Sequence, residues 1–101
     1  MTNKLETKLT VNNKTIELSP FPADFLINVV SATVSSLKGG EDITSLELYV
    51  NQDEVQITVN DRKLRIIAFP NDVIVNTLKG LVSTLKGVET IETIEIDVKS
   101  V

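Results

Sequence analysis

Residues 9–50 read LTVNNKTIELSPFPADFLINVVSATVSSLKGGEDITSLELYV, and residues 57–98 read ITVNDRKLRIIAFPNDVIVNTLKGLVSTLKGVETIETIEIDV, with 16 of the 42 paired positions identical and no gap. A duplication of this length predicts that one structural unit has been built twice. Because the whole chain has only 101 residues, neither half should bury enough apolar surface to be stable alone. We therefore expect a single domain, residues 1–101, in which the two repeats share one core.

Each repeat is expected to open with a hairpin. Apolar and polar side chains alternate from Leu5 to Val11, as a strand with one buried face requires. Asn12-Asn13 in the first repeat and Asn60-Asp61 in the second tolerate the positive φ of a two-residue turn. The return strands are then expected to point these apolar side chains at the core: Ile16, Leu18, Leu64, Ile66 and Ala68.

A helix and a third strand complete each repeat. Phe21-Pro22 and Phe69-Pro70 predict helix starts, because proline fits the first turn of a helix but not a central strand. Lys38-Gly39 and Lys86-Gly87 predict the helix ends, where glycine supplies a left-handed residue. The third strands alternate again, and the apolar side chains expected to face inward are Leu46, Leu48, Val50, Ile94, Ile96 and Val98.

The fold class that follows is α+β. We expect a two-layer structure with a six-stranded, mainly antiparallel sheet and two helices on one face, built from two tandem ββαβ repeats related by a pseudo-twofold axis. With the strands numbered along the chain, the expected order is 2-1-3-6-4-5, which places the third strands of the two repeats side by side. A direct hairpin between strands 3 and 4, through the turn at residues 51–54, is the competing arrangement.

A helical wheel predicts which helix faces meet the sheet and which meet each other. The side chains expected on the sheet are Leu26, Val30, Thr33 and Leu37 in the first helix and Ile74, Leu78, Leu81 and Leu85 in the second. One flank of small residues predicts a helix–helix contact made by Val29, Ala32, Ser36, Thr77, Gly80 and Thr84. Such a contact implies that Gly80→Leu destabilises the fold by overpacking.

An interaction surface is also predicted. The first helix carries no charge between Asp24 and Lys38, and a helix of this kind is often covered, by its own domain or by another subunit. The apolar residues expected to form the surface lie on the other helix flank and on the open face of the sheet: Ile27, Val34, Tyr49, Ile67 and Val75.

Catalytic and metal-binding patterns are absent from the sequence. The chain has no histidine, cysteine or tryptophan, so we expect no enzymatic activity, no catalytic residue, no metal and no cofactor. Asp24 and Asp72 at the helix starts are an acid/base pair only as a minor alternative, because the helix dipole explains them. The basic cluster of Arg62, Lys63 and Arg65 has no aromatic platform beside it, so no nucleic-acid partner is expected.

These observations favour a small non-enzymatic domain that acts by protein association. The lack of a long apolar segment predicts a cytoplasmic protein without a membrane partner, and the net charge of -4, spread over both halves, disfavours a nucleic-acid partner. Self-association as a homo-oligomer is the first expectation, and association with another protein is the second. The alternative function is small-molecule binding or turnover in a cleft on the pseudo-twofold axis, lined by Phe21 and Phe69.

Overall fold

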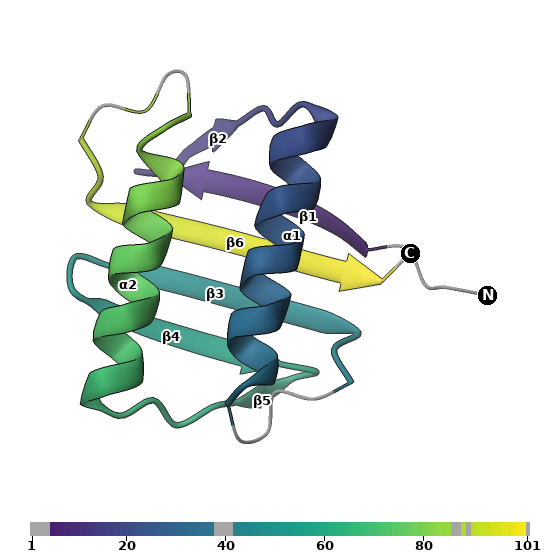
Figure 1. Ribbon diagram of the computed structural model, residues 1–101, viewed down its shortest axis with the longest axis vertical. Helices are drawn as coiled ribbons and strands as arrows, with labels where there is room; N and C mark the ends of the chain where they lie inside the picture. Colours follow the sequence, from purple (N-terminus) through teal and green to yellow (C-terminus); the bar gives the residue numbers. More distant parts are fainter. Residues whose placement is uncertain (1–4, 38–41, 86–87, 89, 101) are drawn as a thin grey trace.

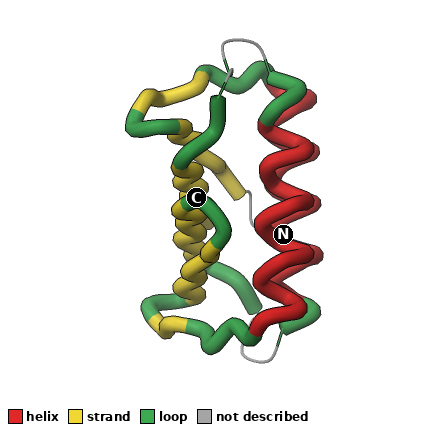
Figure 2. The backbone as a smooth tube through the Cα atoms, turned by 90° about the vertical axis from the view of Figure 1, so that its left-hand side faces the viewer, coloured by secondary structure: helices red, strands yellow, loops and turns green. Residues whose placement is uncertain are grey.

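The computed structural model describes residues 5–37, 42–85, 88 and 90–100. Two helices cover one face of a six-stranded antiparallel sheet, which gives the molecule two layers (Figures 1 and 2). The elements, in chain order, are β1 (Leu5–Val11), β2 (Lys14–Ile16), α1 (Pro20–Ser35), β3 (Ser45–Asn51), β4 (Glu54–Val59), β5 (Arg62–Lys63), α2 (Ala68–Val82) and β6 (Thr93–Ser100). The predicted α+β class, with an antiparallel sheet and two helices, is confirmed.

The strand order differs from the predicted one. The observed order is β2-β1-β6-β3-β4-β5, so β6 and not β3 lies beside β1. The third strands, β3 and β6, are neighbours as expected, and the competing hairpin between β3 and β4 is also present. That hairpin closes through Gln52 and Asp53, and Gln52 has the positive φ, 54°, that a tight turn requires. Because this turn fixes β4 on one side of β3, β6 occupies the other side and separates β3 from β1.

The four central strands come alternately from the two halves of the chain. β1 and β3 belong to the first half, whereas β6 and β4, which pair with them, belong to the second. Within its own half, β1 pairs only with the three residues of β2. Neither half can therefore form the centre of this sheet without the other.

Asn12 connects the first hairpin to the loop before β6. Its φ of 51° places it in the left-handed region that asparagine tolerates. Its Oδ1 atom accepts hydrogen bonds from the backbone N–H groups of Glu92 at 2.7 Å and Thr93 at 3.0 Å. Its Nδ2 atom donates to the carbonyl oxygen of Thr90. A single turn side chain thus satisfies three backbone groups that lie about eighty residues away.

Asn60 makes the corresponding bonds in the opposite direction, from the second half to the first. Its Oδ1 atom accepts from the backbone N–H groups of Thr44 at 2.8 Å and Ser45 at 3.0 Å, and its Nδ2 atom donates to the Asp42 carbonyl at 2.9 Å. Its φ is 49°. The two asparagines therefore hold each half of the chain against the start of the third strand of the other half.

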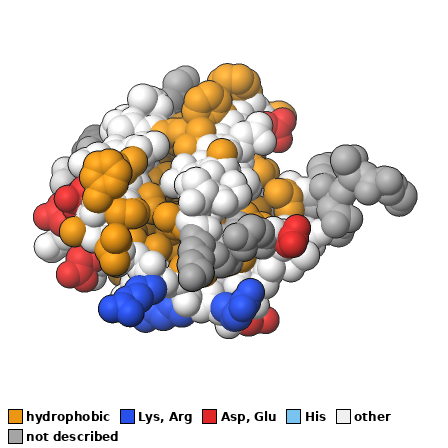
Figure 3. Space-filling model, turned by 60° about the horizontal axis from the view of Figure 1, so that its bottom comes forward, with side chains coloured by type: hydrophobic (Ala, Val, Ile, Leu, Met, Phe, Trp, Pro, Cys, Tyr) orange, Lys and Arg blue, Asp and Glu red, His pale blue; other side chains and the backbone are white. Residues whose placement is uncertain are grey.

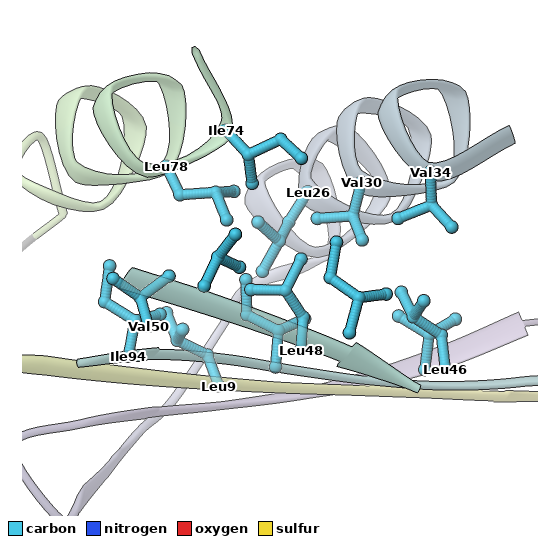
Figure 4. Close-up of a cluster of buried hydrophobic side chains, with 14 of the residues drawn as sticks. Leu9, Leu26, Val30, Val34, Leu46, Leu48, Val50, Ile74, Leu78 and Ile94 are labelled. Atoms are coloured by element: carbon cyan, nitrogen blue, oxygen red, sulfur yellow. The ribbon is translucent and has the colours of Figure 1, made fainter. Parts of the chain in front are cut away.

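The core lies between the sheet and the helices, and Figure 4 shows helix side chains directed at those of the strands. The predicted inward positions of β3 and β6 are confirmed, because all six are at most 2% exposed. The buried helix residues are Leu26, Ile27, Val30, Val34, Ile74, Val75, Leu78 and Val82. The wheel prediction is confirmed for Leu26, Val30, Ile74 and Leu78. Both helices are nevertheless rotated somewhat about their axes, because Leu37, Leu81 and Leu85 pack against the core only partly buried and Thr33 is half-buried.

The return strands are shorter than predicted. β5 contains only Arg62 and Lys63, and Ala68 is an exposed first residue of α2 and not an inward strand position. Proline has no N–H group for a strand ladder, which explains why the chain becomes helical on approaching Pro70. The predicted helix starts are confirmed to within a few residues, whereas the predicted glycine stops at residues 38–39 and 86–87 lie outside the described residues.

The turn asparagines give a test of how the two halves are joined. Asn60→Gly keeps the positive φ easy to adopt but removes the side-chain bonds to the first half, so we expect a loss of about 1–2 kcal/mol in the free energy of unfolding, measured in urea. Asn13→Gly is the matched control, because Asn13 has a φ of 65° and its side chain makes no hydrogen bond within the described residues. A change within about 0.5 kcal/mol is expected there. Equal losses for the two variants would show that the backbone turn, and not the bonds between halves, matters.

Candidate interaction surface

Three of the five residues predicted to form an interaction surface are buried. Ile27, Val34 and Val75 lie on the helix flank that the rotation of the helices turns toward the sheet. A side chain with almost no accessible surface cannot contact a partner without a rearrangement of the core. The prediction is therefore wrong for these three residues.

Tyr49 and Ile67 do not form the expected patch on the open face of the sheet. Tyr49 is half-buried on that face, since its neighbours Leu48 and Val50 point into the core. Ile67 is 66% exposed, but it is the N-cap residue of α2 and not a strand residue. The two side chains therefore lie on different parts of the molecule.

The open face of the sheet is acidic around Tyr49. A shallow hollow of about 340 Å³ is lined there by side chains that include three carboxylates, those of Glu47, Glu95 and Asp97. The strand register places Glu47 directly opposite Asp97, and like charges in this position repel each other. This face is consequently polar and hydrated, which does not favour an apolar contact.

The opposite side of the molecule, the outward surface of the two helices, carries four large exposed apolar side chains among uncharged polar ones, which include Asn28, Asn76 and Ser83. Phe21 and Phe69 are 75% and 77% exposed, and Phe25 and Val73 are 49% and 46% exposed. We call this surface the outer helical face and define it by the exposed residues Phe21, Phe25, Ala32, Phe69, Val73 and Gly80. Figure 3 shows hydrophobic side chains reaching the surface in broad areas, with Lys and Arg side chains gathered along one side of that view.

The two helices carry few charges within their described bounds. α1 contains only Asp24, and α2 contains only Asp72 and Lys79. Lys79 is drawn toward the β3–β4 turn, where its Nζ atom lies 3.4 Å from Oδ1 of Asp53. Little charge therefore remains on the outer helical face.

The residues predicted at a helix–helix contact are mostly on the outside of the molecule. Ala32 and Gly80 are exposed, and a Cβ atom added to Gly80 would meet no atom within 4 Å beyond its own stretch of helix. The expected close approach at Gly80 is therefore wrong, and the rotation of the helices explains it. Of the other four predicted contact residues, Val29 is half-buried, and the remaining three are exposed: Ser36, Thr77 and Thr84. Of these, Thr77 borders the narrow space between the helices.

The space between the middle parts of the helices is too small for a metabolite. It has a volume of about 10 Å³, is bordered by Val30, Thr33 and Thr77 among others, and would hold at most one water molecule. Phe21 and Phe69 begin two helices that run in opposite directions, so they lie at opposite ends of the helical layer (Figure 1). They do not line a common cleft.

A larger groove lies where α1 begins and α2 ends. We call it the aromatic groove; it has a volume of about 380 Å³ and is lined by Phe21, Pro22, Phe25, Leu81, Thr84 and Leu85. The rings of Phe21 and Phe25 form one wall, with centroids 5.9 Å apart and planes tilted by 44°. The groove adjoins a second open space, which is bordered by Ile16 at the end of β2 and by the loop at residues 17–19.

The polar residues weighed as chemical groups are not brought together. Asp24 and Asp72 are exposed, and neither N-cap of the two helices has a side-chain hydrogen bond. Among the described residues, no three Asp or Glu side chains are placed to share a metal ion. Arg62, Lys63 and Arg65 are exposed at the edge of the sheet beside β4.

Comparison of the chain with protein-family models, with curated proteins and with solved structures found no match. Within the described ranges, neither helix has the length and apolar character needed to cross a membrane. The function is therefore argued from the surfaces of this molecule.

Because Gly80 is exposed, we expect a larger side chain at this position to raise the free energy of unfolding and not to lower it by overpacking. Gly80→Ala adds a methyl group in open space and removes backbone freedom from the unfolded chain, so we expect stability to rise by about 0.5–1 kcal/mol in urea denaturation. Ala32→Gly is the matched reverse change at an exposed helix position and should lower stability by a similar amount. Destabilisation by Gly80→Ala would show that another element approaches this residue.

Proposed function

We propose that this protein is a small association domain whose outer helical face binds the same face of a second copy. The observation that carries the proposal is the exposure of four large apolar side chains, those of Phe21, Phe25, Phe69 and Val73, on a surface with almost no charge. Apolar patches of this kind are uncommon on monomers and mark interaction sites. Aromatic residues in particular dominate the energetics of protein interfaces.

The charge distribution favours this face over the other one. The open sheet face is the more highly charged of the two, with the carboxylates of Glu47, Glu95 and Asp97 around Tyr49 and with Lys8 opposite Asp97, and these charges would lose water if two copies met through this face. The outer helical face carries fewer charges, because Asp24 and Asp72 are the only acidic residues of the two helices and Lys79 is paired with Asp53.

The size of the face also suits a dimer. The molecule measures 34 × 34 × 18 Å, and the helical layer spans one of its two broad sides. Helices of 16 and 15 residues are about 24 Å long and about 10 Å wide, so their combined footprint is roughly 500 Å² before side-chain relief is counted. This is of the same order as the roughly 800 Å² that each partner contributes to a standard interface.

We further propose that the fold consists of two tandem ββαβ repeats, at residues 9–50 and 57–98, related by a pseudo-twofold axis between the helices. Two observations support it: Asn12 and Asn60 make matching bonds, and Phe21 and Phe69 have nearly the same exposure. A pseudo-twofold axis places one large apolar side chain at each end of the outer helical face, so this face can contact a second copy at both of its ends.

The proposal describes a cytoplasmic, non-enzymatic protein without a cofactor and without a nucleic-acid or membrane partner. The absence of histidine and cysteine from the sequence and its acidic charge support this part of it. Small-molecule binding in a cleft on the pseudo-twofold axis is the less favoured function, since the space between the helices is only about 10 Å³.

Sedimentation equilibrium over a series of concentrations tests self-association. We expect the wild type to form a dimer and Ala32→Glu, which places a charge on the outer helical face of each copy, to weaken it by at least about tenfold in Kd. Gln56→Glu is the matched control, because it adds the same charge to an exposed position on the open sheet face. It should leave the dimer unchanged, apart from a small general repulsion.

Two results would contradict the proposal. A wild type that stays monomeric at the highest concentration would exclude self-association and leave a different protein as the partner of this face. A dimer weakened by Gln56→Glu but not by Ala32→Glu would place the interface on the sheet.

A further inference from the structure

We propose that Phe69 of a second copy inserts into the aromatic groove, so that two identical insertions hold the two ends of the dimer. This inference rests on the proposed function and specifies the contact that the outer helical face makes. The occupant is a phenylalanine ring of the same chain, and the receiving site is the groove between the start of α1 and the end of α2.

Phe69 has the properties of an inserting side chain. It is 77% exposed, the largest exposure among the large apolar residues of the described chain. One helical turn further along α2 stands Val73, so Phe69 has no aromatic neighbour there. Phe21 differs, because its ring packs against that of Phe25 with centroids 5.9 Å apart. Phe21 is thus part of a groove wall, whereas the ring of Phe69 projects without such support.

The aromatic groove has the size and lining that a phenyl ring requires. An apolar cavity of about 150 Å³ suffices to hold benzene, and the groove measures about 380 Å³. Its walls are the Phe21 and Phe25 rings on one side and Leu81 and Leu85 on the other, with the exposed Thr84 among them. A ring inserted here would contact aromatic and aliphatic carbon on both sides and meet no charged group of the lining.

The arrangement of the helices makes two such insertions compatible with a twofold dimer. α1 and α2 run in opposite directions, so Phe69 lies at the end of the helical layer opposite to the aromatic groove (Figure 1). A twofold axis that lies in the interface and crosses the helices exchanges these two ends between the copies. Each Phe69 is then brought over the groove end of the other copy, and both contacts form together, as an isologous interface requires.

A double-mutant cycle on the dimer Kd, measured by sedimentation equilibrium, tests this contact. Phe69→Ala removes the inserting ring, and Thr84→Lys obstructs the groove from an exposed position without touching the core. Each variant should raise the Kd by at least about tenfold, as expected for an aromatic anchor. In the double variant the Kd should rise by much less than the product of the two single increases, because both changes abolish the same contact.

Ile67→Ala is the matched control for the loss of exposed apolar surface near the start of α2. Ile67 is 66% exposed and directly precedes the helix, and its replacement should change the Kd by less than about threefold. Phe69, Thr84 and Ile67 are all exposed, so we expect each variant to keep the fold. Thermal unfolding of each variant checks this.

The outcomes separate this inference from the proposed function. If Ala32→Glu dissociates the dimer while Phe69→Ala and Thr84→Lys act independently of each other, the aromatic groove does not receive Phe69, and self-association through the outer helical face still stands. If the wild type is a monomer, both proposals are overturned.

Discussion

The structure depends on the position of β6 between β1 and β3. This last strand pairs along all but one of its residues with each of two strands of the first half, and it closes the sheet into one continuous layer. Asn12 and Asn60 reinforce the same connection from the two hairpin turns. The helices depend on it in turn, because both lie across the central strands of the sheet (Figure 1). A chain that fails to place β6 has no complete surface on which α1 or α2 can bury its apolar side.

Local features of this fold could be predicted from the sequence, whereas the long-range ones could not. The inward positions of β3 and β6 follow from strict alternation, and the turns follow from Asn12, Asn60 and their neighbours. Strand order is different, because β1 and β3 present similar apolar patterns and nothing local indicates that β6 lies between them. Only the short turn at Gln52 and Asp53 favoured the β3–β4 pairing that decides the order.

The orientation of the helices was mispredicted for a related reason. α1 has a polar side, marked by Asp24, Asn28 and Ser35, but the flanks with Val34 and with Thr33 lie on either side of the opposite, apolar side, and a helical wheel could not distinguish which of them faces the sheet. The same property produces the candidate site. Since the sheet covers only one side of each helix, part of the apolar surface, including Phe21 and Phe25, stays outside. Phe21 and Phe69 were predicted to mark the helix starts and to line the alternative cleft, and nothing local indicates that they stay on the outside of the molecule.

The central claim is that the outer helical face, and not the sheet, is where this protein meets a second copy. Isotope-filtered NMR on an equal mixture of ¹³C-labelled and unlabelled protein observes contacts between copies directly. The account predicts intermolecular NOEs from the rings of Phe21, Phe25 and Phe69 and none from Tyr49 or Thr58 on the open sheet face. Intermolecular NOEs from Tyr49 or Thr58, with none from the three phenylalanines, would contradict it.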